Sequence, residues 1–326
     1  MNTSDLFWIA KFRKYITGLI RTCGIFKIPK YFFGFLGYNI NMSLTDDQVS
    51  LIKTKAKEIR ISIVKMLAEA RSGHSAGALG MADIFSTLYF SVLGKNDKLI
   101  LSNGHICPVL YASLAEADII PKEELMTLRK FGSKLQGHPH RNFLPILETS
   151  SGPLGSGLSQ SVGVAIADKM DDKNYSKLPK RFIYCLMSDG ELDEGQSWEA
   201  VMLGAKEKLV NLIAIIDRNN IQIGGDTEKV MPLSPLGATL FDKWKAFDWY
   251  VQEVDGHNIE AINSAIIKAQ TNLARPSVII AHTVPGKGVI YMEGRYEWHG
   301  IPPGIQNVKG APEKEKQLEV ALQNLS

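Results

Sequence analysis

Residues 181–225 read RFIYCLMSDGELDEGQSWEAVMLGAKEKLVNLIAIIDRNNIQIGG, and this stretch predicts the core of the fold. An apolar run over Arg181–Met187 ends abruptly at a Ser-Asp-Gly turn, as a buried strand does. Apolar residues then recur at helical spacing over Gln196–Lys208, and a second apolar run over Asn211–Ile216 precedes an Asn-Asn pair. The pattern predicts a strand, an acidic turn, a helix, a second strand and an amide turn.

The two turns carry side chains suited to a metal ion. Asp189 follows the first predicted strand, and Asn219, 30 positions later, follows the second. Consecutive parallel strands end at the same edge of a sheet, and ligands bind at that carboxyl edge in open α/β sheets. A carboxylate and an amide oxygen suit Mg²⁺, which completes its octahedron with phosphate oxygens. The sequence therefore predicts a magnesium site at this edge.

Strands and helices alternate outside this stretch as well. The alternation from Arg181 to His282 predicts an α/β fold with a parallel sheet covered by helices on both faces. We expect one domain over residues 42–308, followed by a charged tail at 309–326 that is a surface helix or a frayed end. The other predicted helices are Leu44–Arg71, Gly80–Leu93, Leu158–Asp168, Leu236–Phe247 and Asn258–Leu273, and the other strands are Asp97–Ser102, Tyr250–Val254 and Ser277–His282.

Composition narrows the functional classes. The chain has 326 residues, 45% hydrophobic and 22% charged, with a formal net charge of +3, so it is long enough to bury a large core. It has no long basic run or aromatic-interleaved basic patch that would indicate nucleic-acid binding. Cys23, Cys107 and Cys185 are far apart, which argues against a disulfide framework or a metal knuckle. We therefore expect a reducing, cytoplasmic compartment.

Residues 1–41 differ from the rest of the chain. Six basic residues stand there against a single acid, Asp5. Charges interrupt every apolar run before it reaches the ~18 residues of a membrane span. A signal peptide would carry its charges before an unbroken apolar segment, whereas here they are mixed into it. Two interpretations remain. The segment is a basic amphipathic arm that contacts a membrane surface or a partner, or the start codon is assigned too early and Met42 is the true start.

Short glycine-containing loops carry three of the seven histidines. His74, His105 and His138 each lie beside a glycine at the end of a predicted element, which predicts a pocket lined by imidazoles. The loop Ser150–Gly157 reads SSGPLGSG and opens a predicted helix. Its glycines let the backbone approach a ligand, and the N-terminus of a helix favours anions.

Six motifs, taken in order, resemble transketolase in the part of that family that binds the cofactor diphosphate. The resemblance covers roughly Leu44–Pro303, and the spacing of Asp189 and Asn219 resembles the thiamine diphosphate signature. The last motif is similar to the stand-alone small subunits of split bacterial transketolases. The motifs are SGHSAGALGMADI (72–84), LSNGH (101–105), GHPH (137–140), SSGPLGSGLSQSVGVAIA (150–167), SDGELDEGQSWEA (188–200) and HTVPGKGVIYMEGRYEWHG (282–300).

The resemblance implies a site for thiamine diphosphate and its metal. Mg²⁺, or Ca²⁺ or Mn²⁺ in its place, would be bound by diphosphate oxygens together with Asp189, Asn219 and the main-chain carbonyl of Ile221. The backbone at Gly190 would lie against the diphosphate. The other implied cofactor contacts are Gly152 and Leu154, at the aminopyrimidine pocket, and His105, at the diphosphate.

The same resemblance implies four catalytic histidines along the path of the sugar: His74, His105, His138 and His299. In the family such histidines hydrogen-bond sugar hydroxyls and move protons during C–C cleavage. An imidazole that is neutral near pH 7 suits both tasks.

The sequence departs from the family pattern at two positions. Ser188 stands where the signature usually has its first glycine, although a small residue keeps the tight turn feasible. His140 stands where an acid commonly follows the proline of the GHP motif, and this leaves the role of that half of the loop open.

The resemblance stops before the family's second domain. That domain supplies the glutamate that activates the aminopyrimidine and most of the arginines that grip the sugar phosphate. We therefore expect an obligate hetero-oligomer with a separate C-terminal subunit, two copies of each chain, and no activity of this chain alone. Glu194 and Glu199 match acidic positions at the interface between family subunits, and their alternative interpretation is a solvated helix face.

The predicted function is that of the N-terminal subunit of a thiamine diphosphate- and magnesium-dependent transketolase. Such an enzyme transfers a two-carbon ketol unit from a ketose donor, for example in the pentose phosphate series, to an aldose acceptor. Three alternatives remain: a subunit of a deoxyxylulose-phosphate-type synthase, a ketol transferase acting on a specialised sugar such as a nucleotide-linked or surface-polysaccharide one, and a non-catalytic cofactor-binding subunit.

Overall fold

A five-stranded parallel sheet forms the centre of the protein. The computed structural model describes residues 43–172, 175 and 179–326, so the predicted basic arm at 1–41 lies outside the described residues. The strand order is β1-β2-β3-β7-β6, and every neighbouring pair is parallel, which confirms the predicted fold class. The strands are β1 (Lys98–Leu101), β2 (Ile183–Ser188), β3 (Leu212–Arg218), β6 (Tyr250–Asp255) and β7 (Ser277–His282).

The register of the strands places the predicted metal ligands at one edge. Ser188 at the end of β2 pairs with Asp217 near the end of β3, and Arg218 pairs with His282 at the end of β7. Asp189 and Asn219 therefore follow two neighbouring strands that end at the same level. The prediction that these two residues meet at one carboxyl edge is confirmed.

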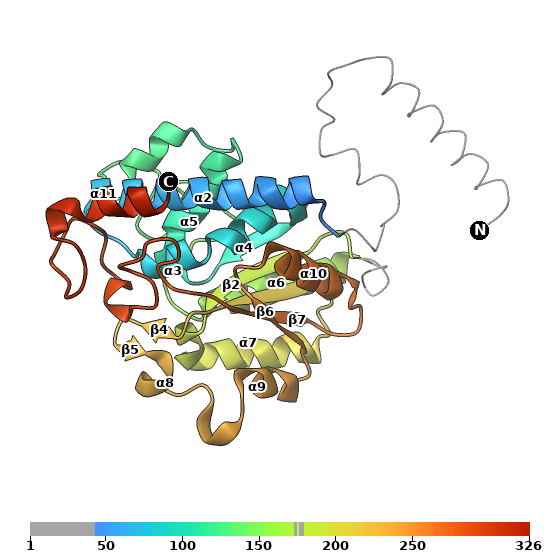
Figure 1. Cartoon of the computed structure of the whole chain (residues 1–326). Helices are drawn as coiled ribbons and strands as arrows, with labels where there is room; N and C mark the ends of the chain where they lie inside the picture. The colour runs from blue at the N-terminus through green and yellow to red at the C-terminus, as the bar shows by residue number, and fades with distance from the viewer. Residues whose placement is uncertain (1–42, 173–174, 176–178) are drawn as a thin grey trace, which may run out of the picture. The chain divides into compact units, whose positions relative to one another are not determined.

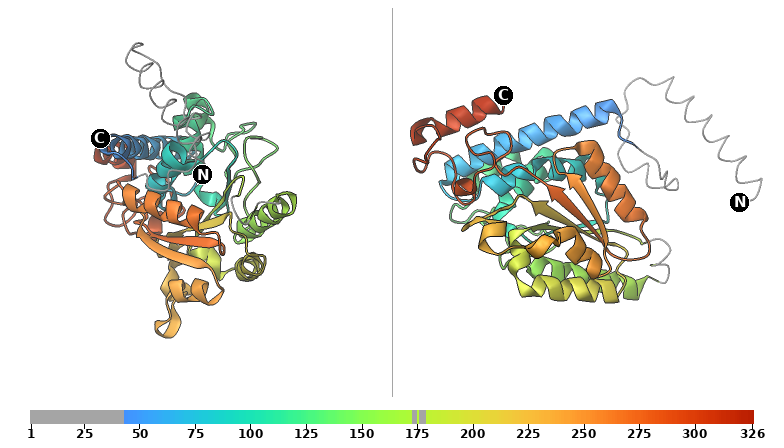
Figure 2. Two further views of the ribbon diagram at one scale, coloured as in Figure 1. Left: turned by 90° about the vertical axis from the view of Figure 1, so that its right-hand side faces the viewer. Right: turned by 60° about the horizontal axis from the view of Figure 1, so that its bottom comes forward.

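Helices cover both faces of the sheet and so bury its central strands β2 and β3 along their whole length. In β2, Tyr184 and Leu186 belong to one core cluster and Ile183, Cys185 and Met187 to another, as the alternation of side chains along a strand requires. Figure 1 shows α2, α4 and α5 on one side of the sheet and α7 and α9 on the other, and Figure 2 shows the twisted sheet between the layers.

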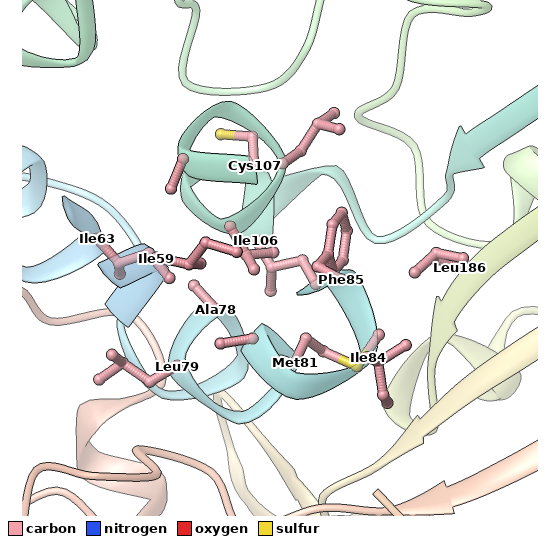
Figure 3. Packing of buried hydrophobic residues seen from close by; sticks show 14 of the residues in the cluster. Ile59, Ile63, Ala78, Leu79, Met81, Ile84, Phe85, Ile106, Cys107 and Leu186 are labelled. Atoms are coloured by element: carbon pink, nitrogen blue, oxygen red, sulfur yellow. The ribbon is translucent and has the colours of Figure 1, made fainter. Parts of the chain in front are cut away.

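The first face is covered by α2 (Asp46–Ala70), α3 (Ala76–Gly80), α4 (Ala82–Thr87), α5 (Cys107–Glu116), α10 (Ile259–Thr271) and α11 (Lys314–Asn324), and the second by α6 (Ser156–Asp171), α7 (Gly195–Lys206) and α9 (Leu240–Ala246). Figure 3 shows how Ile59 and Ile63 of α2, Ala78 and Leu79 of α3, and Phe85 of α4 pack in the first core.

Several predicted element boundaries are wrong. The helix expected at Gly80–Leu93 is instead α3, α4 and a π-helical turn, with a break at Met81. The glycines of α3 serve close packing: a Cβ on Gly77 would lie 2.9 Å from Cγ2 of Ile106, and one on Gly80 would lie 3.1 Å from the Val284 carbonyl. Ile106 and Val284 are far from α3 in the chain, so the local sequence pattern does not predict these close contacts.

Other differences concern short or unpredicted elements. The helix expected at Leu236–Phe247 is reduced to α9, which begins after Thr239 because that residue caps it together with Asp242. The sequence patterns did not predict α5, the hairpin β4 (Ile221–Gln222) and β5 (Gly225–Asp226), or α8 (Thr227–Val230). The tail contains the helix α11, whose Ala321 is buried, so it is a packed surface helix rather than a frayed end.

Candidate functional site

Three imidazoles from distant segments of the chain meet at the carboxyl edge of the sheet. His74 follows α2, His105 follows β1, and His299 lies in the long segment after β7. Their ring centroids are 4.9 Å apart for His74 and His105, 5.4 Å for His74 and His299, and 5.2 Å for His105 and His299. The structure thus brings together three of the four histidines that the sequence singles out.

Burial keeps these imidazoles neutral. It lowers the pKa of His299 from 6.5 to about 4. Burial is also the largest cause that lowers the pKa of His74 to about 4, followed by the charge of His299 and that of Arg129. The pKa of His105 falls well below its usual value for the same main reason, and then through His74 and His299. All three rings are therefore uncharged near neutral pH and can both donate and accept hydrogen bonds.

The cluster lies next to the predicted metal edge. A Cβ on Gly300 would touch both the ring of His74, at 3.7 Å, and Cδ1 of Ile223, at 3.8 Å. A Cβ on Gly77, three residues after His74, would lie 3.9 Å from Nδ2 of Asn219. The imidazoles and the ends of β2 and β3 thus belong to one continuous site.

Buried polar atoms without partners indicate that the site is built for a polar ligand. Among the described residues, Nδ1 of His74, Nδ1 of His299, Oγ of Ser151 and both amide atoms of Asn103 have no hydrogen-bond partner, although all are shielded from solvent. Buried polar groups in folded proteins are nearly always paired. These five atoms lie in the histidine loops and the glycine-rich loop, which fits a polar ligand bound there.

The carboxylate of Asp189 is fully buried and firmly oriented. Its Oδ1 accepts a hydrogen bond from the Gly190 amide at 2.8 Å, and its Oδ2 accepts from Nη1 of Arg218 at 3.0 Å and from the Asn220 amide at 2.8 Å. Burial raises the pKa of Asp189 to about 6, and the charge of Arg218 opposes that rise. Oδ1, which accepts only one of these bonds, retains the capacity to bind a cation.

A second buried carboxylate orients the amide of Asn219. Nδ2 of Asn219 donates to Oδ2 of Asp217 at 2.7 Å, and the side-chain oxygen of Asn219 accepts from the Ile221 amide at 3.0 Å. Burial raises the pKa of Asp217 to about 7, while the hydroxyl of Thr283, which donates to this carboxylate, opposes that rise. These partners fix the orientation of the Asn219 amide, because the carboxylate of Asp217 can only accept and the Ile221 N–H can only donate.

The donor set fits Mg²⁺ bound together with a diphosphate. Asp189, Asn219 and the carbonyl of Ile221 offer only hard oxygen atoms, as this ion prefers. No group of three or more His, Cys, Asp or Glu residues in the described part of the chain is arranged to hold a metal by itself. A metal here would need further oxygen ligands, such as those of a bound phosphate group.

The glycine-rich loop is tied to this edge by a carboxylate that the sequence patterns did not single out. Glu191 is fully buried, and it accepts hydrogen bonds from the amides of Gly155 at 3.0 Å and Ser188 at 3.1 Å and from the hydroxyl of Ser102. Burial raises its pKa to about 7. Its place in an acidic turn, two residues after Asp189, indicates a carboxylate near the site, but only the fold shows that the glycine-rich loop and the end of β1 also bond to it.

The other predicted positions in this loop and at α7 are accessible. A Cβ on Gly152 would meet no atom within 4 Å, which leaves open space above the backbone there. The carbonyl of Leu154 accepts from Nε2 of Gln196 at 2.6 Å, which fastens the loop to the start of α7. Glu194 and Glu199 are exposed at that end of α7, as an interface position requires, and their role stays a prediction.

His138 and His140 differ in their surroundings. His138 is exposed, and its charge contributes to lowering the pKa of His74 and of His105, so it faces the same cluster without joining the three rings in contact. The ring of His140 instead packs edge-on against Phe143, at 5.1 Å between centroids, within its own loop. Arg129, which the motifs did not indicate, donates to the Gly137 carbonyl at 3.3 Å and so places a positive charge beside this loop.

The fold and the site together define an α/β cofactor-binding protein with neutral imidazoles and oxygen ligands at the carboxyl edge of its sheet. The family described as "Transketolase, thiamine diphosphate binding domain" matches residues 52–317, so the chain belongs to the transketolase family. The part of that family that the chain matches is its thiamine diphosphate-binding domain.

Relatives of the split type match over nearly their whole length. The chain is 38% identical to an apulose-4-phosphate transketolase subunit of Phocaeicola vulgatus over 83% of this chain and 96% of that protein. It is 37% identical to a 6-deoxy-6-sulfo-D-fructose transketolase subunit of Clostridium sp. over 79% of this chain and 93% of that protein.

Solved transketolases share the fold over part of their length. The enzyme from Campylobacter jejuni is 32% identical, with a TM-score of 0.70, over 84% of this chain and 46% of that chain. The complex of the Pichia stipitis enzyme with sedoheptulose 7-phosphate gives a TM-score of 0.72 at 28% identity, over 84% of this chain and 44% of that chain. The chain thus spans less than half the length of these solved enzymes.

Proposed function

We propose that this chain anchors the cofactor diphosphate and part of the sugar in a two-subunit transketolase, which transfers a two-carbon ketol unit from a ketose to an aldose. The observation that supports this proposal most is the contact of three neutral imidazoles beside the oxygen ligands at the ends of β2 and β3. Thiamine diphosphate, when bound, supplies the electron sink that C–C cleavage next to a carbonyl requires.

The residues of this chain hold the cofactor and its metal in the proposal. Asp189, Asn219 and the Ile221 carbonyl bind Mg²⁺, for which Ca²⁺ or Mn²⁺ can substitute. Arg218 and Asp217 keep the first two side chains oriented through their hydrogen bonds to them. The backbone at Gly190 would lie against the diphosphate, and Gly152 and Leu154 would border the aminopyrimidine pocket.

The histidines act on the sugar. His74 and His299 each present an Nδ1 atom without a protein partner, and we expect these atoms to bond sugar hydroxyls or the reacting carbonyl oxygen. Because all three clustered rings are neutral, each can donate or accept a hydrogen bond at a substrate oxygen, and a ring that takes up a proton can return it in a later step. His105 is proposed to serve the diphosphate as well as the sugar, and His138 to act at the rim.

The proposal includes a second chain. Relatives that match over nearly their full length are themselves named as subunits of transketolases, which supports a separate partner. We propose that this partner is a C-terminal transketolase subunit that meets Glu194 and Glu199, in an assembly of two copies of each chain. The donor and acceptor are proposed only as a ketose and an aldose, because the named relatives act on different sugars.

The metal assignment is tested by cofactor binding to Asp189→Ala. We expect calorimetric titration with thiamine diphosphate and Mg²⁺ to show binding to the wild-type chain, supplemented with the partner if required, and none that depends on Mg²⁺ in the variant. Asp168→Ala, which removes the partner of Arg181 at the opposite ends of the strands, is the matched control and should bind normally. Unaltered affinity of Asp189→Ala would remove the assignment.

The two-chain assembly is tested by native mass spectrometry of the tagged chain isolated from its own cells, with Mg²⁺ and thiamine diphosphate present. A complex with a second chain and cofactor is expected, and this complex should transfer a ketol unit while the isolated chain does not. Recovery of only a homodimer would contradict a stable two-subunit enzyme and would favour a non-catalytic binding protein.

A further inference from the structure

A chain of buried, hydrogen-bonded side chains contacts the segment that carries His299. We use the name strap for residues Val284–Ile301, which follow β7, contain no strand or α-helix, and bury Val289, Met292 and Trp298. Between the strap and α2 lie two titratable side chains that the proposed mechanism does not use, Asp83 of α4 and His257 of the loop after β6.

Both ring nitrogens of His257 are engaged. The Val284 amide donates to Nε2 at 2.8 Å, and Nδ1 lies 2.7 Å from Oδ2 of Asp83. A backbone N–H can only donate, so Nε2 must present its lone pair and the ring proton must be on Nδ1. His257 is therefore held as the neutral tautomer that donates to Asp83 and accepts from the strap.

Asp83 is itself fixed from the other side. Arg60 of α2 donates to it through two nitrogens, Nη1 at 3.2 Å and Nη2 at 2.5 Å, and its Nε donates to the Leu79 carbonyl at 3.1 Å. This two-pronged geometry is the most directional ion pair that side chains form. Arg60, Asp83 and His257, the buried relay, thus form a chain of hydrogen bonds that links α2 and α4 to Val284, the first residue of the strap.

Two further contacts fasten the strap to α3 and its flank. The Gly286 amide donates to the Ala76 carbonyl at 2.8 Å, and the hydroxyl of Ser75 donates to the Ile301 carbonyl at 2.8 Å. Ser75 directly follows His74, so the far end of the strap is bonded beside one imidazole of the cluster and carries another. The distance between His74 and His299 depends on how the strap is docked at both ends.

From these contacts we infer that His257 is a positioning residue for the histidine cluster: it locks the start of the strap and thereby sets His299 against His74 and His105. The inference deepens the proposed function and rests on it for its catalytic consequence. Its structural content, the placement of His299 by the relay, holds for any activity of the site. The hydrogen-bond partners of the His257 ring are Asp83 and Val284, which belong neither to the clustered imidazoles nor to the predicted metal ligands.

The test uses the full chain with histidine labelled by ¹⁵N, and it reads the ring resonances by NMR without cofactor or substrate. The resonances of His299 and His74 are assigned with His299→Gln and His74→Gln. In His257→Leu, which removes donor and acceptor together, we expect both resonances to move. In His257→Gln, whose amide offers one donor and one acceptor, we expect them to stay near the wild-type positions.

His282→Gln is the control, because this histidine at the end of β7 is exposed and pairs with Glu253 at 3.3 Å. It should remove its own signal and leave the others in place. If His257→Leu does not fold, Asp83→Asn tests the same relay, because the amide turns one of the two acceptor oxygens into an N–H donor and cannot accept all three bonds from Arg60 and His257. Unmoved His299 and His74 resonances in a folded relay variant would overturn the inference.

Activity of the assembled enzyme gives a separate readout. A displaced His299 should lower kcat by about a hundredfold in His257→Leu, the scale of an ångström misplacement, with recovery in His257→Gln. If the resonances move and no ketol transfer is found for the wild-type assembly, the proposed function fails while the positioning role stands. If ketol transfer is found and His257→Leu retains full turnover, the positioning role in catalysis fails.

Discussion

At the scale of single residues, burial determines the chemistry of the histidine cluster. An exposed imidazole would be partly charged just below neutral pH, whereas His74, His105 and His299 share a desolvated space in which a charge on one ring raises the cost of a charge on the next. The three rings are thus ready to donate and accept at neutral pH, and they oppose protonation as the pH falls.

This behaviour predicts a pH-dependent stability difference for His299→Gln. Folding lowers the pKa of His299 from 6.5 to about 4, so the folded chain binds this proton more weakly than the unfolded chain does. The resulting cost is absent well above pH 6.5 and grows as the pH falls toward 4. Between pH 7 and pH 5, the variant should gain about 2 kcal/mol of unfolding free energy relative to wild type.

Denaturant unfolding at the two pH values measures this difference, with His282→Gln as the exposed control, for which we expect no such gain. Parallel stability profiles of wild type and His299→Gln would show that His299 is solvated in the folded chain.

Glu191 provides a second prediction at this scale. Glu191→Gln replaces one carboxylate oxygen by an amide nitrogen, which cannot accept from the amides of Gly155 and Ser188 or from the hydroxyl of Ser102. We expect a loss of about 1–3 kcal/mol of unfolding free energy, the cost of leaving a buried donor unpaired. The exposed Glu199→Gln should change stability little, and equal effects of the two substitutions would contradict the role given to Glu191.

At the scale of elements, the start of α6 shows how close packing sets the glycine-rich loop. A Cβ on Gly157 would collide with the backbone and side chain of Ser102 at the end of β1, whereas one on Gly163, in the same helix, would meet no atom within 4 Å. The helix can therefore approach the sheet only if position 157 has no side chain, and this approach brings the loop to the carboxyl edge.

Matched alanine substitutions test this packing. Gly→Ala in an exposed helix interior stabilises by about 0.5–1 kcal/mol, and we expect this gain for Gly163→Ala. Gly157→Ala should instead lose about 1–3 kcal/mol through overpacking and should weaken cofactor binding. The difference between the two variants in chemical denaturation is the measurement, and stabilisation by both would refute the close approach.

At the scale of the whole molecule, residues 43–326 contain the sheet, both cores and every predicted site residue. Residues 1–42 lie outside the described part of the chain. None of the described helices combines the length and the apolar character that a bilayer crossing requires.

Removal of residues 1–41 is expected to leave the unfolding transition and the cofactor affinity of the remaining chain unchanged, because the sheet, both cores and the candidate site are formed by residues 43–326. Thermal unfolding and calorimetric titration of the two forms compare them directly. A lower Tm or weaker binding of the shortened chain would show that the segment is part of the folded unit.

The sequence by itself determined the features that depend on local periodicity and on turns. The two apolar runs and the helix between them, read from residues 181–225, predicted parallel strands that place Asp189 and Asn219 at one edge, and the strand register confirms it. The six motifs predicted the family, which the match over residues 52–317 shows. Such features are visible because each depends on a few neighbouring residues.

Only the tertiary structure decided what depends on contacts between distant segments. The glycines of α3 serve packing against Ile106 and Val284, which no local pattern indicates, and nothing near Glu191 in the sequence shows that the Gly155 amide and the Ser102 hydroxyl bond to it. The neutrality of the histidine cluster and the relay from Arg60 to the strap have the same origin. Burial and hydrogen-bond partners arise when elements far apart in the chain pack together, and a sequence pattern records only one side of each contact.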